Sequence, residues 1–144
     1  MKSENQVVLE FPSRSSNESF ARVAAAGFAM QLDPTLEELG DIKTAVSEAV
    51  TNAIIHGYPD CIGRIVMKLR IREGNVMEII VKDWGVGIAD VEQARKPMFT
   101  TGNDERSGMG FTIMESFMDT IRVKSAPQKG TTVTLKKRIS TRMG

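Results

Sequence analysis

The spacing of apolar residues changes abruptly near residue 60, and this change limits the fold more than any other feature of the chain. Between about 36 and 56, apolar residues recur every three or four positions, which predicts a helix with one buried side. The chain then alternates in "RIVMKLRI", turns at "EGN" and returns in "VMEIIVKD", which predicts an antiparallel hairpin. The residues expected to face the core from the helix are Leu39, Ile42, Val46, Ala49, Val50 and Ala53.

The segment before this helix predicts one strand and one further helix. "QVVLEF" at 6–11 alternates as a strand does. Ser15 and Glu18 have the spacing of a capping box and should start a helix. "DPT" at 33–35 should end it, and Thr35 with Glu38 forms a second candidate capping box. The buried stripe of this first helix is expected to contain Phe20, Val23, Ala24, Gly27 and Phe28.

The last third of the chain completes the predicted sheet. A short helical candidate near 90–95 lies in a long, weakly patterned segment at 84–110, and such a segment is usually functional or disordered. A helix is expected to start at Phe111, followed by a hairpin around "APQKG". The sequence therefore predicts an α+β fold, a two-layer sandwich of about five mostly antiparallel strands with three main helices on one face.

Composition indicates an ordinary globular protein and excludes several classes. The 144 residues suit a single domain over 1–144, with 41% hydrophobic and 26% charged residues. A net charge of +1 gives no case for nucleic acid as the main partner. The short basic runs "KLRIR" and "LKKR" are interpreted as solvent-facing sides of strands. A single cysteine, Cys61, with no signal peptide and no membrane span, predicts a cytoplasmic protein.

The helix at 36–56 also carries a polar stripe. Glu48, Asn52 and His56 are spaced at i, i+4 and i+8, so they line up on one side of the helix. An Asn oxygen suits Mg²⁺, and a carboxylate one turn away could accept a proton from a nucleophile. The alternative is a solvated Glu and a surface Asn.

"DWGVG" at 83–87 follows directly on a predicted strand. Asp83 could accept a hydrogen bond from an exocyclic amine, and Gly85 and Gly87 would let the backbone approach a flat ligand. A plain turn after the strand is the alternative.

"SGMGF" at 107–111 places two glycines at the expected start of a helix. Free backbone N–H groups and the helix dipole there favour an anion, most often phosphate. Arg106 could bind a phosphate through two parallel N–H···O hydrogen bonds from its guanidinium. A flexible loop that ends in a helix cap, with a solvated Arg, is the alternative, and "KGTT" at 129–132 alone indicates only a hairpin turn.

These weak motifs become specific in combination. An E-x-x-x-N helix, D-x-G-x-G after a strand, a G-x-G at a helix start and a late G-T-T resemble the GHKL ATP-binding superfamily, which has the Bergerat-type fold. The resemblance covers about 35–138 and implies ATP and Mg²⁺, with Asn52 on the metal, Asp83 on the adenine amine and a lid at about 93–110. The further nucleotide contacts that it implies are Gly85, Gly87, Thr101, Ser107, Gly108, Met109, Gly110, Phe111 and Thr131.

The absence of added domains narrows the resemblance to the anti-sigma factor serine kinases, and "SNESFARVAAAGFAMQLDPTLEEL", "VSEAVTNAIIHGY" and "ERSGMGFTIMESFMD" are similar to sporulation members of that family. Such a protein holds a sporulation sigma factor inactive and phosphorylates a small anti-anti-sigma antagonist protein on serine, as a homodimer. By resemblance Glu48 accepts the serine proton, Arg106 holds the phosphates and Arg22 contacts partners. A solvated Arg22 is the alternative, and the lid is about one residue shorter than the family leads us to expect.

Two other functions stay open at this point. The domain could be an ATP-gated binding module without catalysis, although Glu48 would then have no purpose as a base. It could also be the catalytic domain of a histidine kinase that acts in trans. The only histidine, His56, belongs to the helix of the ATP site and cannot serve as a mobile acceptor.

Overall fold

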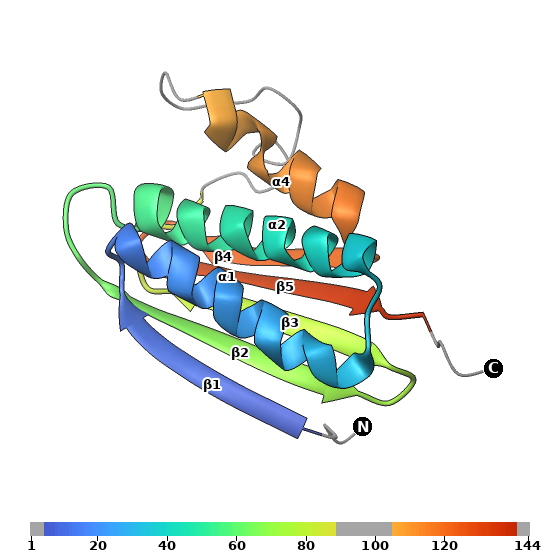
Figure 1. Cartoon of the computed structure of the whole chain (residues 1–144). Coiled ribbons are helices and arrows are strands. Elements are labelled where there is room, and N and C mark those ends of the chain that lie inside the picture. The colour runs from blue at the N-terminus through green and yellow to red at the C-terminus, as the bar shows by residue number, and fades with distance from the viewer. Residues whose placement is uncertain (1–4, 89–104, 141–144) are drawn as a thin grey trace.

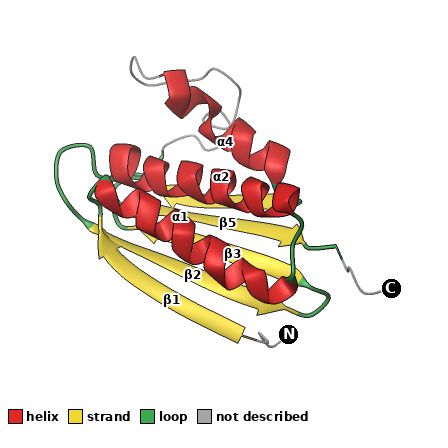
Figure 2. Cartoon of the chain, viewed as in Figure 1, coloured by secondary structure: helices red, strands yellow, loops and turns green. Residues whose placement is uncertain are grey.

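The protein folds into two layers, a five-stranded sheet and a layer of helices that covers one of its faces (Figures 1 and 2). The computed structural model describes residues 5–88 and 105–140, and for 105–110 it describes the backbone alone. The strand order is β1-β2-β3-β5-β4, and each neighbouring pair is antiparallel. The elements are β1 (Asn5–Pro12), α1 (Ser16–Ala29), η1 (Met30–Leu32), α2 (Leu36–Asn52), η2 (Ala53–Gly57), β2 (Arg64–Arg72), β3 (Val76–Asp83), α4 (Glu105–Phe117), β4 (Thr120–Ala126) and β5 (Gly130–Arg138).

This architecture confirms the predicted α+β sandwich, with a sheet that is antiparallel throughout the described residues. The expected strand and both hairpins are present within one or two residues of their predicted bounds. The short helix near 90–95 lies outside the described residues. No helix in the described ranges has the length and apolar character needed to cross a membrane.

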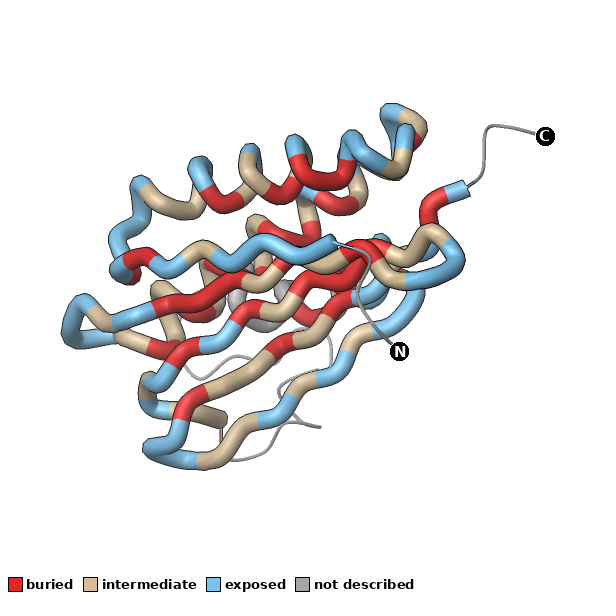
Figure 3. The backbone as a smooth tube through the Cα atoms, turned by 90° about the horizontal axis from the view of Figure 1, so that it is seen from below, coloured by how far each residue is buried: buried red, intermediate tan, exposed pale blue. Residues whose placement is uncertain are grey.

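The core lies between the sheet and α2. Along much of β2 and β3 buried residues alternate with less buried ones, but 65–67 and 77–79 are runs of three buried residues (Figure 3). Five of the six residues predicted to face the core from α2 and its extension are buried, and Leu39 packs against the cluster from a half-buried position. The side chains that they meet on the sheet include Met67, Leu69, Ile79, Val81 and Leu135, all of them at most 2% exposed.

The start of α2 is held by the capping box that the sequence predicts. The Thr35 hydroxyl accepts from the Glu38 N–H at 3.0 Å, and the Glu38 carboxylate accepts from the Thr35 N–H at 2.9 Å. The second carboxylate oxygen of Glu38 accepts from the N–H of Ser140 at 2.9 Å. One side chain therefore caps α2 and fixes the segment that follows β5.

Helix α1 differs from the prediction in both its cap and its buried face. Ser15 is itself helical and its side chain makes no capping bond, so the first capping box was wrong. Phe20 and Val23 are 60% and 62% exposed, and Gly27 is also exposed. The buried face consists of Ala21, Ala25, Phe28 and Ala29. Small side chains at this spacing let α1 lie close to α2, and this close packing outweighs the burial of the larger residues on the other side.

A partly buried lysine links three elements at the far end of the helical layer. Lys137 of β5 points to the core side, where its ammonium lies 3.3 Å from the Asp41 carboxylate of α2. The same ammonium donates at 2.9 Å to the carbonyl of Phe117, the last residue of α4. The contact satisfies a carbonyl at the helix end and places a positive charge at the negative end of the helix dipole.

We expect Lys137→Met to lower the free energy of unfolding by about 1–3 kcal/mol, because it leaves Asp41 and the α4 carbonyl without their charged partner. Urea unfolding followed by circular dichroism measures the change. Lys43→Met on the exposed side of α2 is the matched control and should change stability by less than about 0.5 kcal/mol. Equal effects of the two variants would contradict a structural role for the Lys137 contacts.

Candidate functional site

The candidate site is built around Asp83, a carboxylate that is only 4% exposed at the end of β3. Burial raises the pKa of Asp83 above that of an ordinary Asp, and hydrogen bonds from the backbone N–H groups of Gly85 and Thr131 partly offset this. The bond from Gly85 to Oδ1 measures 2.9 Å. A buried carboxylate with a perturbed pKa is a feature typical of ligand sites.

The glycines of "DWGVG" are required by close backbone contacts. A side chain at Gly85 would collide with the carbonyl of Gly57, and one at Gly87, where φ is +76°, would collide with the carbonyl of Ala126. The loop is held from both sides, because Val86 donates to the Gly57 carbonyl at 2.9 Å and accepts from the Gln128 N–H at 2.6 Å. These glycines therefore let the loop pack against the end of η2 and the β4–β5 turn beside Asp83, and the predicted approach to a flat ligand stays a prediction.

The sequence reasoning missed two residues that fix this loop. A side chain at Gly57 would come within 3.0 Å of the Asp83 carboxylate, so only glycine leaves room there. The Tyr58 hydroxyl accepts from the Trp84 N–H at 2.7 Å and donates to the Arg64 carbonyl at 2.6 Å. Burial raises the pKa of Tyr58, so the hydroxyl stays protonated and able to donate. No local signal marks either residue, because their partners are distant in sequence.

Thr131 lies beside Asp83, to which it is paired in the β3–β5 register. Its hydroxyl is 2.7 Å from that of Ser125. Ser125 also accepts from the Ile88 N–H at 2.7 Å, so the residues after the glycines are tied to the same hairpin. The "GTT" segment is therefore part of the Asp83 neighbourhood, although alone it indicated only a turn.

Glu48 and Asn52 occupy the last two turns of α2 and are half-buried. They lie one helical turn apart on the same side, as predicted. The helix continues past Asn52 as the π-helical segment η2, which ends at Gly57 against Asp83. Segments of this kind often occur at functional sites. The helix that carries Glu48 and Asn52 therefore leads directly to the buried carboxylate.

The glycine-rich segment before Phe111 departs from the prediction. Helix α4 begins at Glu105, so the backbone of Ser107, Gly108, Met109 and Gly110 is helical instead of leading into a helix at Phe111. Each Gly costs a helix only about 1 kcal/mol, which packing of α4 against α2 can offset. Arg106 belongs to the first turn of α4, where N–H groups lack intrahelical partners. Thr101 and the rest of the expected lid lie outside the described residues.

Arg22 lies on α1, half-buried beside two exposed apolar residues. Its guanidinium is 3.7 Å from the Glu18 carboxylate and 3.5 Å from the Ser19 hydroxyl. Phe20 and Val23 flank it in sequence and are largely exposed. The structure thus places Arg22 on α1 beside Glu18 and Ser19, on a different side of the helix from Phe20, and does not bring it into contact with Asp83.

A separate hollow of about 750 Å³ lies between the start of α1 and the loop after η2. Its lining includes Arg14, Ser15, Ile54, Tyr58 and Cys61. None of the predicted nucleotide or catalytic residues lines it. It shares only Tyr58 with the neighbourhood of Asp83, so it is not the candidate site.

Metal binding at the site would depend on few protein ligands. In the parts of the chain that the structure describes, no three His, Cys, Asp or Glu side chains come together as a metal cage. Mg²⁺ bound with a nucleotide usually takes only one or two protein ligands and completes its shell with phosphate and water. The half-buried amide of Asn52 fits that requirement.

Comparisons of the sequence with known proteins show the family to which this chain is related. A sequence profile of the histidine kinase-like ATPase domain matches residues 11–137. The chain is 59% identical over 137 residues to an anti-sigma F factor of Geobacillus kaustophilus, and 54% identical over 138 residues to one of Bacillus subtilis. Each alignment covers 94% of both chains. A third anti-sigma F factor, from Thermoanaerobacter, is 56% identical and covers 96% of this chain and 97% of its own.

Solved structures agree at the level of the fold. The RsbU and RsbW domains of a Mycobacterium tuberculosis protein superpose with a TM-score of 0.68 at 20% identity, over 95% of this chain and 32% of that one. A mycobacterial sensor histidine kinase, MprB, gives a TM-score of 0.56 at 22% identity, over 71% and 74% of the two chains. Taken with the matched profile and the full-length relatives, these likenesses show that the chain belongs to the histidine kinase-like ATPase domain family and, within it, to the group of the anti-sigma F factors.

Proposed function

We propose that this protein is an ATP-dependent anti-sigma factor that binds a sporulation sigma factor and phosphorylates a small antagonist protein on serine. The observation that carries the proposal is the identity of 54–60% to proteins named anti-sigma F factors over nearly the full length of both chains. The buried Asp83, the glycines after it and the polar side of α2 supply a site of the kind that such a protein needs.

Asp83 would bind the adenine of ATP. The carboxylate has one N–H donor from Gly85 and one from Thr131, and its remaining lone pairs can accept from the exocyclic amine. Gly85 and Gly87 hold the loop after Asp83 against the carbonyls of Gly57 and Ala126, and the backbone of this loop would contact the base. Thr131, next to Asp83 in the register, would contact the same end of the nucleotide.

The phosphates would lie toward the end of α2 and the start of α4. Asn52 would bind Mg²⁺, whose charge offsets that of the phosphates and aids transfer. The first-turn N–H groups of α4, which include those of Ser107 and Gly108, and the guanidinium of Arg106 would attract the phosphate oxygens. Met109, Gly110 and Phe111, which the resemblance also assigns to the nucleotide, lie beyond this first turn. Thr101 would contribute from the expected lid.

Glu48 would act as the general base. It lies one turn before Asn52, so a serine hydroxyl directed at the γ-phosphate would pass close to its carboxylate. Glu48 accepts the serine proton as the oxygen attacks phosphorus and the bond to the β-phosphate oxygen breaks. Most of the remaining rate enhancement would come from positioning and charge stabilisation.

The exposed side of α1 would bind the protein partners. Phe20, Val23 and Met30 are each more than half exposed, at a spacing that puts them on one side of the helix. Exposed apolar residues are common at protein interfaces, and arginine is enriched there. Arg22 would contact the sigma factor and the antagonist in turn.

A homodimer would use β1, one of the two edge strands of the sheet. Strand β1 pairs with β2 only, so its other edge presents unpaired backbone groups, and Val7 and Val8 on it are 40% and 50% exposed. Such an edge is a template for pairing with a second copy. The proposal follows the family resemblance and is consistent with this geometry.

We expect Glu48→Ala to reduce transfer of γ-labelled phosphate from Mg·ATP to a candidate antagonist protein by about 10²–10⁴-fold, because the general base is lost. Nucleotide affinity should be unchanged. Acid treatment of the wild-type product identifies the acceptor, since label on serine is acid-stable and label on histidine is acid-labile. Glu37→Ala, at an exposed position in the first turn of α2, is the matched control and should transfer normally.

Each result of this assay has a distinct meaning. Unchanged transfer by Glu48→Ala removes Glu48 from its role. Acid-labile label replaces the serine kinase by a histidine kinase that acts in trans. Binding of ATP with no label on any antagonist leaves an ATP-gated binding module in place of a kinase.

We expect Asp83→Asn to weaken ATP binding by about 10–100-fold, because the amide puts a donor where the carboxylate accepted. Wild-type affinity should also fall on acidification, at a higher pH than for an ordinary Asp, because burial raises the pKa of Asp83. Titration calorimetry over a range of pH measures both effects. Asp60→Asn, at an exposed loop position, should bind as the wild type does.

A comparison of the wild type with Asp83→Asn in the absence of nucleotide tests the burial of Asp83. A carboxyl group with a raised pKa stabilises the fold when protonated, and this contribution is lost as the pH rises through the raised value. Wild-type stability should therefore increase relative to Asp83→Asn when the pH falls from neutral into the acid range. A constant difference between the two proteins would contradict the raised pKa.

We expect Arg22→Glu to weaken binding of both the sigma factor and the antagonist by at least about tenfold. The substitution removes the contacts of the guanidinium and puts a negative charge in its place. ATP affinity should not change. Surface plasmon resonance with each partner in the presence of Mg·ATP measures the effect, with Lys43→Glu on α2 as the control of equal charge change. Normal binding of both partners by Arg22→Glu would end this assignment.

A further inference from the structure

The face of the sheet that the helices leave uncovered is strongly basic. The five strands direct nine Lys and Arg side chains to this face, against two carboxylates, Glu10 and Glu78. The whole chain carries a net charge of only +1, so the cations are concentrated here and the rest of the chain carries a net negative charge. We call this surface the basic sheet face, and its cations are Arg64, Lys68, Arg70, Arg72, Lys82, Arg122, Lys124, Lys136 and Arg138.

The placement of these cations follows from the register. Lys68, Ile80, Thr134 and Arg122 are neighbours across four strands, and Arg70, Glu78 and Lys136 form the adjacent row. The residues between them in sequence, such as Met77 and Ile79, are buried on the helical side. The cations therefore alternate away from the core, where no helix of the described chain covers them (Figure 1).

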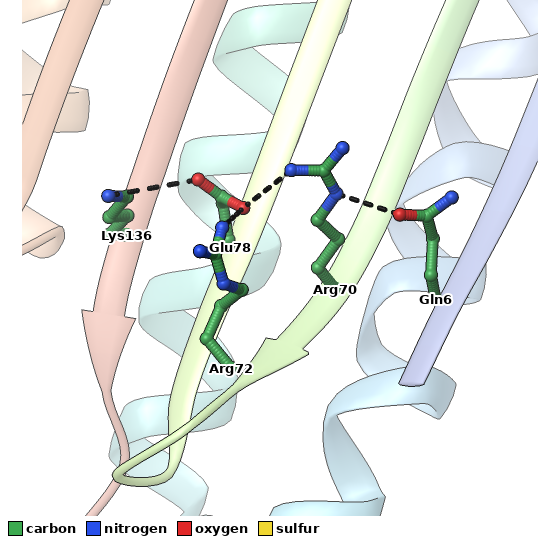
Figure 4. A network of polar contacts seen from close by, with 5 residues as sticks. All are labelled: Gln6, Arg70, Arg72, Glu78 and Lys136. Carbon is green, nitrogen blue, oxygen red and sulfur yellow. Dashed lines mark hydrogen bonds and ion pairs between the residues drawn. The ribbon is translucent and has the colours of Figure 1, made fainter. Parts of the chain in front are cut away.

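A buried carboxylate orders the centre of the basic sheet face. Glu78 is 4% exposed, and its carboxylate lies 3.3 Å from Arg70, 2.9 Å from Arg72 and 3.8 Å from Lys136 (Figure 4). Arg70 also donates at 2.8 Å to the side-chain oxygen of Gln6. The two guanidinium groups are thus held in fixed orientations, and their ordering entropy is already lost before any ligand binds.

Other cations of the face have no such partner. Among the described residues, no carboxylate lies within ion-pair distance of Lys68, Lys82, Arg122 or Lys124. Unpaired cations close to one another and to the fixed guanidinium groups repel each other, and the binding of an anionic partner lowers this repulsion.

We propose that the basic sheet face binds an acidic protein surface, a third partner whose site is distinct from the nucleotide site and from α1. Fixed guanidinium forks suit carboxylates held at defined positions on a folded partner. Thr132, Thr134 and Gln6 lie among the cations and can hydrogen-bond to such a surface. Complementary charge supports fast and selective association of this kind.

The same face is less suited to nucleic acid or a membrane. Its aromatic residue, Trp84, already stacks with Arg64 at 4.3 Å and Lys82 at 5.0 Å, so the ring is not free for a base. The strands present no protruding helix or ribbon that could enter a groove. Val8 and Trp84 are the side chains of the face among the large exposed apolar residues of the described chain, and Trp84 is already covered by two cations, whereas interfacial membrane binding relies on several free apolar side chains.

The test uses three labelled or immobilised probes at physiological ionic strength with the ATP-bound full chain. They are a peptide of twelve alternating Asp and Glu residues, a random-sequence DNA duplex, and vesicles of phosphatidylcholine with phosphatidylglycerol. We expect the wild type to bind the peptide more tightly than either other probe. Lys68→Glu/Arg122→Glu should weaken peptide binding by at least about tenfold. The control Arg14→Glu/Lys43→Glu changes the net charge equally, outside the basic sheet face, and should bind as the wild type does.

The variant Glu78→Gln tests whether peptide binding depends on the fixed orientation of Arg70 and Arg72 or only on the total positive charge of the face. It makes the face more positive but releases Arg70, Arg72 and Lys136, so we expect weaker peptide binding, provided that its circular dichroism spectrum is that of the wild type. Tighter binding of the peptide by this variant would overturn the proposed role of the ordered guanidinium groups. Stronger binding of DNA or vesicles than of peptide, or no binding of any probe, would overturn the acidic-protein proposal. ATP binding and phosphate transfer are measured separately, so failure here leaves the proposed function untouched.

Discussion

The burial of one carboxylate, Asp83, is the constraint to which the rest of the site conforms. A carboxylate removed from water must receive hydrogen bonds, and the N–H groups of Gly85 and Thr131 supply them. Gly57 has no side chain, so the end of η2 can approach the carboxylate. The helical layer, the glycine loop and the β4–β5 hairpin therefore meet at a group whose raised pKa records the cost of its burial. Carboxylates perturbed in this way are concentrated at functional sites, which supports the proposed role of Asp83.

The fold was predictable because apolar residues recur at clearly different spacings in its helices and in its strands. The apolar stripe of α2 and the alternation in β2 and β3 indicate their own structures without reference to the rest of the chain. The bond between Thr35 and Glu38 joins residues three apart, so spacing alone revealed it. Asp83 and its glycines were also recognisable, because they follow a strand that the pattern marks clearly.

The features that could not be predicted depend on contacts between distant segments. The spacing in α1 allowed either of two faces to be buried, and close packing of Ala21 and Ala25 on α2 decided against Phe20 and Val23. Helix α4 extends to Glu105 although two glycines oppose it, because α2 lies alongside. Tyr58 acquires its role from Trp84, 26 residues later.

The basic sheet face arises because neighbouring residues of a strand point to opposite sides of the sheet. Lys136 and Lys137 are adjacent, yet Lys136 reaches Glu78 on the open face while Lys137 reaches Asp41 and the end of α4 on the other. A strand sends successive residues to opposite sides, so a chain of near-neutral composition can still carry one basic surface. Because α1 and the residues proposed to bind the nucleotide belong to the helical side, a partner on the open face would not compete for either. The partner proposed for the basic sheet face and the ligands proposed for the helical side could therefore be bound at the same time.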